Sequence, residues 1–463
     1  MQISINGRRE RSKRSKSKPS ILDIYRGATK PQKALLIYAL VQMLALTMFQ
    51  KVGLPASDKL LQLCLPTAVG GMAVLAYWVR PKVDKVRALL YGAFCFFAFV
   101  STFFQPAGQS TTSFLLALLI YAPFVVFYEV PPRIFRVIVE LFIGIMMVAG
   151  AIVLLQHLVQ LTAGWRAWPN LDEMIPPGLL MPNFVYIQPI TPDSQFMKPN
   201  GVFFAEVSIL SQFLCLALVM EIVYLQRVVP TAFLIIALLL TFAGTGLFML
   251  ALTLPFLLTR FTRRTWILLA IAFVAALIVA DQINWFDQMS GRFTEYQRQN
   301  TSANHRFIAP WKLLVDFLHR DDALYTGIGA GSILKADNVV WWPFTKVTVE
   351  YGLLTAISFY ALFIYALFWR TPNWRVSICF FVFFSFMGGG FLVPIYPLLC
   401  MLFCANFREV VEHRPRRRRR SISSEGSGQD AGSHVSRSSS RSRRGVDGES
   451  LPVARSGSVE GAE

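Results

Sequence analysis

Long apolar runs constrain this chain more than any other feature of its sequence. A helix needs about 20 apolar residues to cross the core of a bilayer. Runs of about that size cover residues 34–52, 59–79, 88–104, 113–129, 136–160, 201–226, 266–281 and 346–368. Only 16% of the residues are charged, against roughly 25% in a soluble domain. These features predict an all-α polytopic membrane protein and exclude an ordinary soluble enzyme or a disordered chain.

Two further apolar blocks, residues 229–258 and 376–406, are too long for one upright helix. Thirty helical residues span about 45 Å, whereas the hydrocarbon core is about 30 Å thick. Each block also contains helix breakers near its middle, at residues 243–246 in the first and at 388–397 in the second. The breakers favour a tight hairpin of two short helices in each block over one strongly tilted helix.

The distribution of basic residues decides between these two arrangements. Lys or Arg occurs in each of the short loops at residues 80–87, 130–135, 259–265 and 369–375. Two hairpins place all four loops on the side of both tails, as the tendency of basic loops to stay in the cytoplasm requires. The sequence therefore predicts about twelve transmembrane helices with both termini cytoplasmic. Large outer loops follow at about 161–200 and, between spans 9 and 10, at about 282–345.

Most of the formal net charge of +18 lies in the two tails. Residues 1–34 hold ten Lys or Arg and two acids, a net +8, and residues 412–463 hold eleven Arg and seven acids, a net +4. We expect a basic cytoplasmic tail at 1–33, a transmembrane domain at 34–411 and a disordered, Arg- and Ser-rich cytoplasmic tail at 412–463. Arg416–Arg420 directly follow the last span, which favours contact with anionic lipids over binding to nucleic acid.

The cysteines give no sign of a disulfide framework or of a metal site. All six lie inside apolar stretches, where they are expected to be small core residues. The first apolar run begins only near Ala34 and lacks an obvious cleavage site, so it is interpreted as a transmembrane helix rather than a signal peptide. No cofactor is expected.

The second outer loop is predicted to contain a helix. Residues 304–319 place apolar side chains at helical spacing, including Trp311, Leu314 and Leu318. Two interpretations fit this pattern equally well. The helix lies on the membrane surface, or it packs on a small core of the loop itself.

Polar residues gather where the outer loops meet the spans. Lys198 lies at the end of the first outer loop, and Glu206 lies about two turns into the next span. A carboxylate inside a span is costly and by default suggests function, although inward-facing polar packing is the simpler explanation. The second outer loop contains His305 and Arg306 and then a spaced glycine run.

The glycine run consists of Gly327, Gly329 and Gly331 and precedes Lys346 and Glu350 at the start of the next span. Backbone amides in a glycine-rich loop can approach an anion closely, and nearby cations add fixed positive charge. A plain turn has the same pattern, so the glycines alone are a weak signal.

The order and sidedness of these motifs resemble the bacterial O-antigen ligase and Wzy polysaccharide polymerase superfamily. The matching features are Lys198-x-x-Gly201, Glu206-x-Ser208, a hairpin at Thr241–Gly246, an outer loop with Arg306 and Trp311, Gly327-x-Gly329-x-Gly331, and Glu350-Tyr351-Gly352-Leu353. The resemblance implies a GT-C-like, metal-independent glycosyltransferase in the bacterial inner membrane. It implies a substrate of undecaprenyl-diphosphate-linked oligosaccharide, and a chain-length regulator and a flippase as partners.

The resemblance also implies roles for individual residues. The developing charge on the leaving diphosphate would be met by Arg306, and further diphosphate contacts would come from Lys198, Gly327, Gly329, Gly331 and Lys346. Glu206, His305 or, less favoured, Glu350 would act as general base. Trp311, Trp341, Trp342 and Glu350 would bind sugar. Snorkelling to lipid headgroups is the simpler explanation for Arg306 and Lys198, and an interfacial belt is the simpler one for the tryptophans.

Two departures from the superfamily pattern separate the functional alternatives. The hairpin turn has Ala243–Gly246 where many members carry a Ser-Arg pair, and Trp341-Trp342 stand where many carry His-Asn. Ligases depend on that histidine, so its absence favours a polymerase over a ligase. A transporter or flippase is the alternative from a different class, but the two halves lack the matched charged residues expected of repeats.

Overall fold

The computed structural model describes residues 20–56, 59–104, 110–182, 184, 186–190, 194–261, 263–282, 304, 308–320, 323–333, 340–387 and 390–409. The chain divides into two units, Met1–Glu412 and His413–Glu463, and the second lies outside the described residues. The predicted tails at 1–33 and 412–463 therefore remain predictions, apart from the helix at Ile21–Arg26 and the start of the next one.

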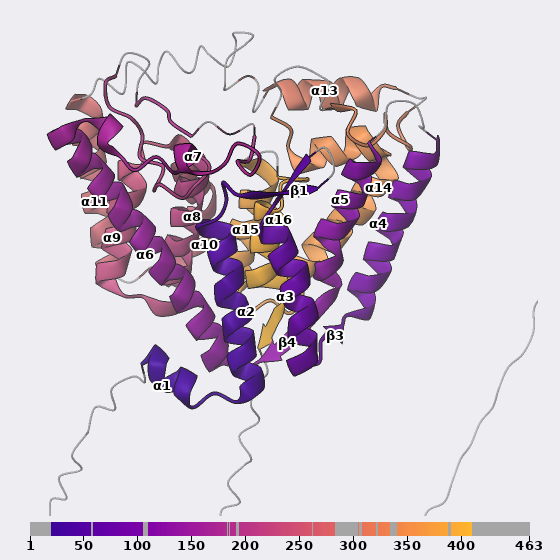
Figure 1. Cartoon of the computed structure of the whole chain (residues 1–463), viewed down its shortest axis with the longest axis horizontal. Coiled ribbons are helices and arrows are strands. Elements are labelled where there is room, and N and C mark those ends of the chain that lie inside the picture. Colours follow the sequence, from indigo (N-terminus) through magenta and orange to yellow (C-terminus); the bar gives the residue numbers. More distant parts are fainter. Residues whose placement is uncertain are drawn as a thin grey trace, which may run out of the picture. The chain divides into compact units, whose positions relative to one another are not determined.

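The described part of the first unit is mostly helical (Figure 1). Its helices are α1 (Ile21–Arg26), α2 (Lys30–Thr47), α3 (Cys64–Trp78), α4 (Lys85–Phe104), α5 (Thr111–Tyr121), α6 (Pro132–Ala163), α7 (Leu171–Met174), α8 (Val207–Met220), α9 (Val228–Leu240), α10 (Gly244–Leu257), α11 (Arg263–Gln282), α13 (Ala309–Leu318), α14 (Pro343–Phe368), α15 (Trp374–Phe386) and α16 (Ile395–Cys400). Short 3-10 segments occur at Ala122–Val125, Trp165–Ala167 and Leu258–Arg260, and π-helical turns extend α8 to Leu225 and α16 to Ala405.

Four of the described helices are long and apolar enough to cross a membrane. They are α4, α6, α8 with its π-helical extension, and α14, and several shorter apolar helices accompany them. The protein is thus a polytopic membrane protein, and the total of twelve crossings remains a prediction. The expected break in each long block is confirmed, because α9 ends at Leu240 before α10 begins at Gly244, and α15 ends at Phe386 before α16 begins at Ile395.

Two small sheets depart from the all-α expectation. Strands β1 (Gly53–Ala56) and β2 (Lys59–Gln62) form an antiparallel hairpin where the second span was expected to begin. Strands β3 (Lys82–Val83), β4 (Val126–Val130) and β5 (Phe407–Glu409) form a three-stranded sheet. β4 replaces the last turn of the predicted span 113–129, because a short apolar run rich in Val and aromatic residues suits a strand as well as a helix.

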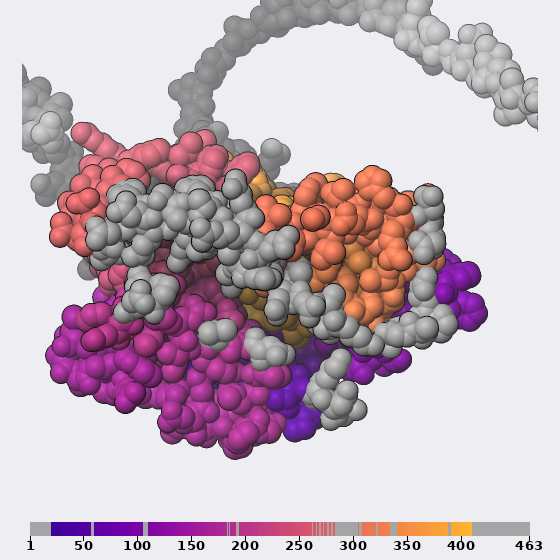
Figure 2. Space-filling view, turned by 90° about the horizontal axis from the view of Figure 1, so that it is seen from above, coloured from indigo at the N-terminus to yellow at the C-terminus, as the bar shows by residue number. Residues whose placement is uncertain are grey.

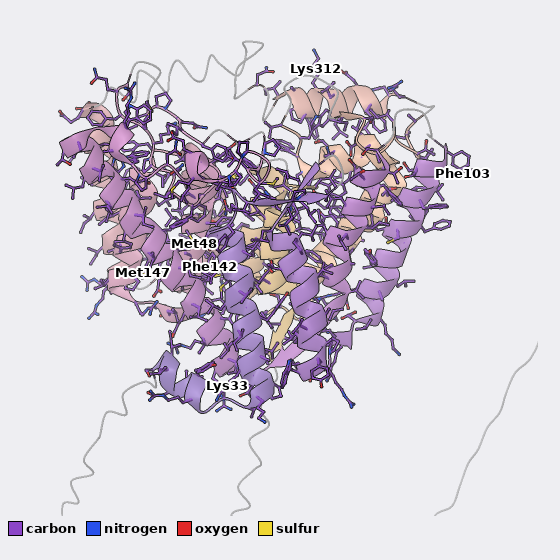
Figure 3. All side chains as sticks on the ribbon, in the orientation of Figure 1. Lys33, Met48, Phe103, Phe142, Met147 and Lys312 are labelled. Carbon is purple, nitrogen blue, oxygen red and sulfur yellow. The ribbon has the colours of Figure 1, made fainter. Side chains whose placement is uncertain are left out.

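The core surrounds α8, which is buried along its whole length except at Ser208. This helix packs against α6, α9, α10 and α15, while α14 packs along α4. Phe142 on α6 points into this core, whereas Phe103 near the end of α4 points outward (Figure 3). Exposed phenylalanines on α4 fit a lipid-facing surface, since lipid tails are as apolar as the side chains that meet them.

The connections segregate to two ends of the described helices. α7, α13 and β1 lie at one end, and α1, β3 and β4 lie at the other (Figure 1). Viewed from above, the segment around 161–200 and the segment around 308–333 occupy different sides of the first end (Figure 2). We call the end with α7 and α13 the outer end, a label taken from the predicted topology, which itself remains a prediction.

Candidate functional site

Glu206 lies at the outer end of the buried helix α8, as its N-cap residue, with an extended backbone. The prediction that it lies two turns inside a helix is wrong, because positive φ angles at Gly201 and Val202 keep residues 201–205 out of the helix. The Ser208 hydroxyl donates a hydrogen bond of 2.7 Å to Glu206 Oε2. Glu206 is half-buried, and Ser208 is the one residue of α8 that is not buried. This corner of the core therefore presents a carboxylate and a hydroxyl at an accessible position.

The turn between α9 and α10 packs directly against this corner. Ser211 Oγ lies 3.1 Å from Thr245 Oγ1, and the Thr245 hydroxyl donates to the Ser208 carbonyl at 3.2 Å. A Cβ atom on Gly246 would lie 2.5 Å from the Ser211 carbonyl oxygen, so only glycine permits this approach. The hairpin that the sequence predicted thus adds Thr245 to the polar group formed by Glu206 and Ser208.

Loop residues hold the other side of Glu206. The Ala205 amide donates to Gln50 Oε1 at 3.2 Å, which fixes the backbone just before the carboxylate. Burial, with smaller contributions from the Asp172 and Glu206 carboxylates, raises the pKa of the Tyr186 phenol to about 12. The phenol therefore stays protonated near neutral pH, and its hydroxyl donates to the Met181 carbonyl.

Lys198 belongs to a segment that two glutamines of α6 hold in place. Gln160 Oε1 accepts from the Met197 amide at 2.7 Å, and Gln156 Oε1 accepts from the Gly201 amide at 2.9 Å. Sequence reasoning missed both glutamines, although two amide side chains four residues apart in an apolar span share one helix face and are a signal of polar packing. Lys198 itself is half-buried.

The spaced glycines pack against a break in α14. Gly352 has φ 82° and ψ 169°, a conformation that interrupts the helix. The carbonyls that lose helical partners there are satisfied by the glycine loop, because the Ile328 amide donates to the Val349 carbonyl at 2.9 Å and the Gly329 amide donates to the Glu350 carbonyl at 3.0 Å. A Cβ atom on Gly327 would lie 2.4 Å from the Glu350 carbonyl oxygen. The pattern of glycines therefore serves a close backbone contact.

Lys346 and Glu350 form a buried ion pair beside this loop. Lys346 Nζ lies 3.2 Å from Glu350 Oε1, one helical turn apart, and the Glu350 side chain is fully buried. The amides of Gly331 and Ile333 face the carboxylate. Among the described residues, neither carboxylate oxygen has a well-aligned hydrogen bond, and the closest charged contact is the Lys346 ammonium.

The group at Glu206 and the pair at Lys346 lie on neighbouring elements. The end of α15 connects them, since Gln212 Nε2 on α8 donates to the Met387 carbonyl at 3.3 Å. The adjacent Phe386 ring meets the Trp342 ring edge-on, with centroids 5.8 Å apart, at the start of α14. Two polar groups far apart in sequence are thus joined through the outer end of α15.

The predicted sugar-binding tryptophans occupy different environments. Trp341 is 8% exposed and belongs to a small cluster with Leu314, Phe317 and Val349. α13 therefore packs on a core of its own loop, as one of the two interpretations of 304–319 predicted. Trp311 on the same helix is 56% exposed. The sugar-binding roles of all three tryptophans stay predictions.

Two predicted catalytic residues, His305 and Arg306, lie outside the described residues. Their roles stay predictions, as do the diphosphate roles of Lys198, Lys346, Gly327, Gly329 and Gly331. Within the described part of the chain, no group of three or more His, Cys, Asp or Glu side chains is arranged to hold a metal ion.

Fold and site together define a polytopic membrane protein with buried polar groups gathered at one end of its helices. Comparison with known families then narrows the class. A family model described as WcaD colanic acid polymerase matches residues 65–409, most of the chain. The protein belongs to this family of Wzy-type polysaccharide polymerases, and membership implies a glycosyltransferase-type enzyme that makes exopolysaccharide from repeat units. A search of curated proteins finds no match.

Proposed function

We propose that the protein polymerises undecaprenyl-diphosphate-linked oligosaccharide repeat units into an exopolysaccharide at the outer face of the bacterial inner membrane. Both termini are then cytoplasmic, and the outer end of the helices faces the periplasm. Membership in the polymerase family supports the reaction class. The observation that carries the site is the group of Glu206, Ser208 and Thr245 at an accessible corner of an otherwise buried span.

The proposed step is a glycosyl transfer between two lipid-linked substrates. A hydroxyl of the acceptor unit forms a bond to the anomeric carbon of the donor, and the bond from that carbon to the diphosphate oxygen breaks. The electron pair of the broken bond goes to the diphosphate, and the hydroxyl proton goes to a general base. Glu206 is the proposed base, because its carboxylate is held by Ser208 and lies beside the accessible part of α8.

The leaving diphosphate gains negative charge during this step, and fixed cations stabilise it. Lys346 is the described candidate, since its ammonium lies at the start of α14 and pairs with Glu350, whose carboxylate faces the amides of Gly331 and Ile333. Arg306 and Lys198 are proposed to complete the diphosphate site, and no metal is assigned a role. A ligase or a transporter has less support, because the family match is to a polymerase.

Lipid-linked glycans in cells that lack the gene test the reaction. A polymerase deletion should leave single repeat units on the carrier at the outer leaflet, with loss of high-molecular-mass polymer. Long chains that remain on the carrier would instead indicate a ligase. Single units trapped at the inner leaflet would indicate a flippase.

Glu206→Gln tests the proposed base within this reaction. The amide keeps an oxygen to accept from Ser208 but cannot take a proton at neutral pH, so polymer synthesis should fall by about 10²–10⁴-fold, the usual contribution of a general base. Glu129→Gln is the matched control, because Glu129 is an exposed carboxylate on β4 at the opposite end. Full polymer yield from Glu206→Gln at normal protein level would rule out this role.

A further inference from the structure

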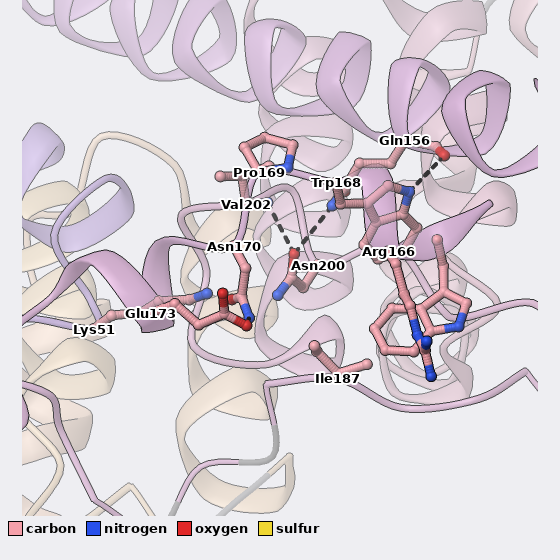
Figure 4. A pocket seen from close by; sticks show the side chains of 11 residues that line it. Lys51, Gln156, Arg166, Trp168, Pro169, Asn170, Glu173, Ile187, Asn200 and Val202 are labelled. Atoms are coloured by element: carbon pink, nitrogen blue, oxygen red, sulfur yellow. Dashed lines mark hydrogen bonds between the residues drawn. The ribbon is translucent and has the colours of Figure 1, made fainter. Parts of the chain in front are cut away.

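A cavity of about 330 Å³ lies at the outer end, apart from the Lys346 pair. Side chains from three places in the chain line it: Lys51 just after α2, Gln156 in the outer part of α6, and the 165–202 segment (Figure 4). Its volume is at the lower end of the range for small-molecule sites, roughly 300–1,000 Å³. The cavity is thus large enough for a small part of an oligosaccharide rather than a whole lipid-linked substrate.

Two tryptophans give this cavity an aromatic wall. Gly164, with φ 79°, ends α6 and lets the chain turn into the 3-10 segment Trp165–Ala167. Trp165 and Trp168 are three residues apart, which places them on the same side of such a turn. The Trp168 indole Nε1 donates to the Gln156 carbonyl at 2.9 Å, so that ring is held in position by α6. Both rings are half-buried and both line the cavity.

Amide and charged groups surround the tryptophans. Asn200 is 5% exposed and is held by Gln156 Nε2 at 3.3 Å and by the Tyr186 carbonyl at 2.9 Å. Asn170 Nδ2 donates to Glu173 Oε1 at 2.9 Å, and both side chains lie on the side of the cavity away from Arg166 (Figure 4). Such a mixture of donors and acceptors around aromatic rings suits sugar hydroxyls and the apolar faces of sugar rings.

The charges disfavour a diphosphate at this place. Lys51 is buried and already bound to Asp172, with 2.6 Å between Nζ and Oδ1, and its ammonium lies 4.9 Å from the centre of the Tyr186 ring. Glu173 is the carboxylate that lines the cavity. An anion there would meet this carboxylate, a lysine already neutralised by Asp172 and one exposed cation, Arg166, whereas a sugar would meet hydrogen-bonding partners of both kinds.

The cavity and the proposed base share one segment of chain. Asn200 and Val202 line the cavity, and four residues later the same segment reaches Glu206. Gln50, next to Lys51, accepts from the Ala205 amide and so ties the cavity wall to the backbone before Glu206. We propose that this cavity is a saccharide-binding subsite that holds a sugar ring of the repeat unit away from the reacting bond. The identity of that sugar as part of the repeat unit rests on the proposed function.

Direct binding tests the subsite without the reaction. The probes are oligosaccharides released by partial acid hydrolysis from the exopolysaccharide of wild-type cells, added to the full-length protein in lipid nanodiscs. Saturation-transfer NMR and calorimetry should detect binding to the wild type, and Trp165→Ala should raise Kd at least tenfold. Trp165→Phe should retain most of the affinity, because it keeps an aromatic face.

Two controls separate the subsite from the fold and from the chemistry. Trp78→Ala removes an exposed tryptophan at the end of α3, outside the cavity, and should leave Kd unchanged. Glu206→Gln should bind the fragments as the wild type does, even if it makes no polymer. If gene deletion leaves the polymer intact, the proposed function fails while this binding result still stands.

Three outcomes would overturn the subsite. The first is wild-type affinity in Trp165→Ala. The second is the absence of any saturation transfer from the fragments to wild-type protein. The third is Trp165-dependent binding of inorganic diphosphate in place of the fragments, which would make the cavity an anion site.

Discussion

Two buried cations lie near opposite ends of the packed helices α4 and α14. Arg87 on α4 is fully buried and donates to three backbone carbonyls, those of Phe124 at 3.3 Å, Ala405 at 2.8 Å and Ala366 at 3.0 Å. Lys346 on α14 is 6% exposed and pairs with Glu350 of its own helix. The first cation joins three separate elements, while the second stays within one.

The difference separates a structural charge from a candidate functional one. The planar guanidinium of Arg87 directs several donors at once, and carbonyls near the ends of helices carry partial negative charge that it neutralises. A single ammonium such as Lys346 is a point charge, and it pairs with a carboxylate of its own helix instead of joining separate elements. A buried ion pair is weak evidence for stability, so Lys346 is a candidate for function.

The largest expected loss of stability follows from replacing Arg87. Arg87→Met should lower the free energy of unfolding by about 5 kcal/mol, since each of three charge-assisted hydrogen bonds contributes about 1.5–3 kcal/mol. Arg87→Lys should recover only part of this, because an ammonium does not reproduce the fork of donors. Denaturant unfolding of the purified variants in detergent measures both. A near-normal unfolding midpoint for Arg87→Met would contradict the view that Arg87 stabilises the fold.

Variants of the Lys346–Glu350 pair should separate an effect on stability from an effect on activity. Lys346→Met leaves Glu350 as an uncompensated buried charge and should cost about 3–5 kcal/mol. Adding Glu350→Gln removes that charge and should restore most of the stability, while polymer synthesis stays low. Unfolding midpoints and polymer yield are measured on the two single variants and the double variant. A double variant with normal stability and normal polymer yield would make Lys346 purely structural.

A smaller effect is expected at the break in α14. Gly352→Ala forces an L-residue into a backbone region that costs about 1–3 kcal/mol, and its Cβ atom would also lie 2.1 Å from the Tyr325 carbonyl oxygen. Thermal unfolding should show the loss, and polymer yield should fall with it because the glycine loop moves. Gly144→Ala in α6 is the matched control, with no heavy atom within 4 Å of the new Cβ, and should be neutral or slightly stabilising.

The smallest effect is expected for an exposed ion pair at the Arg87 end. Lys82 Nζ and Glu129 Oε2 lie 2.6 Å apart, but both side chains are about half exposed. Lys82→Ala should therefore change the free energy of unfolding by about 0–1 kcal/mol, with polymer yield unchanged. A loss as large as that of Lys346→Met would contradict the view that burial, rather than pairing, separates these charges.

The breaks in the long apolar blocks were predictable because their causes are local. Residues 243–246 and 388–397 contain glycine and proline, whose backbone preferences act at their own position in the chain. The strand β4 was not predictable in the same way, because Val126–Val130 is short and mostly apolar, and its partners β3 and β5 lie about 40 and 280 residues away in the chain. Hydropathy reflects the cost of exposing a side chain to water. It does not indicate which other segment of the chain will pair with a strand through backbone hydrogen bonds.

The site shows the same division. The sequence singled out Glu206 inside a predicted span, the glycine run in the second outer loop and Lys346 at the start of the next span, because polar residues are conspicuous in apolar surroundings. It did not reveal that the glycine loop satisfies the broken helix at Gly352, that Thr245 reaches Ser208, or that Gln50 and Gln156 hold the segment before Glu206. These contacts join residues many positions apart, and amides of this kind look like ordinary polar residues in a linear pattern.

The sequence by itself determined that the chain enters a membrane and that its two long apolar blocks break. It did so because the bilayer penalises exposed polar groups at each position separately, so composition along the chain is sufficient. Only the tertiary structure decided which buried charges act as structural joints and which polar groups meet at the outer end. The role of each buried polar group depends on hydrogen bonds to backbone groups that are far away in the sequence. These hydrogen bonds exist only after the helices have packed.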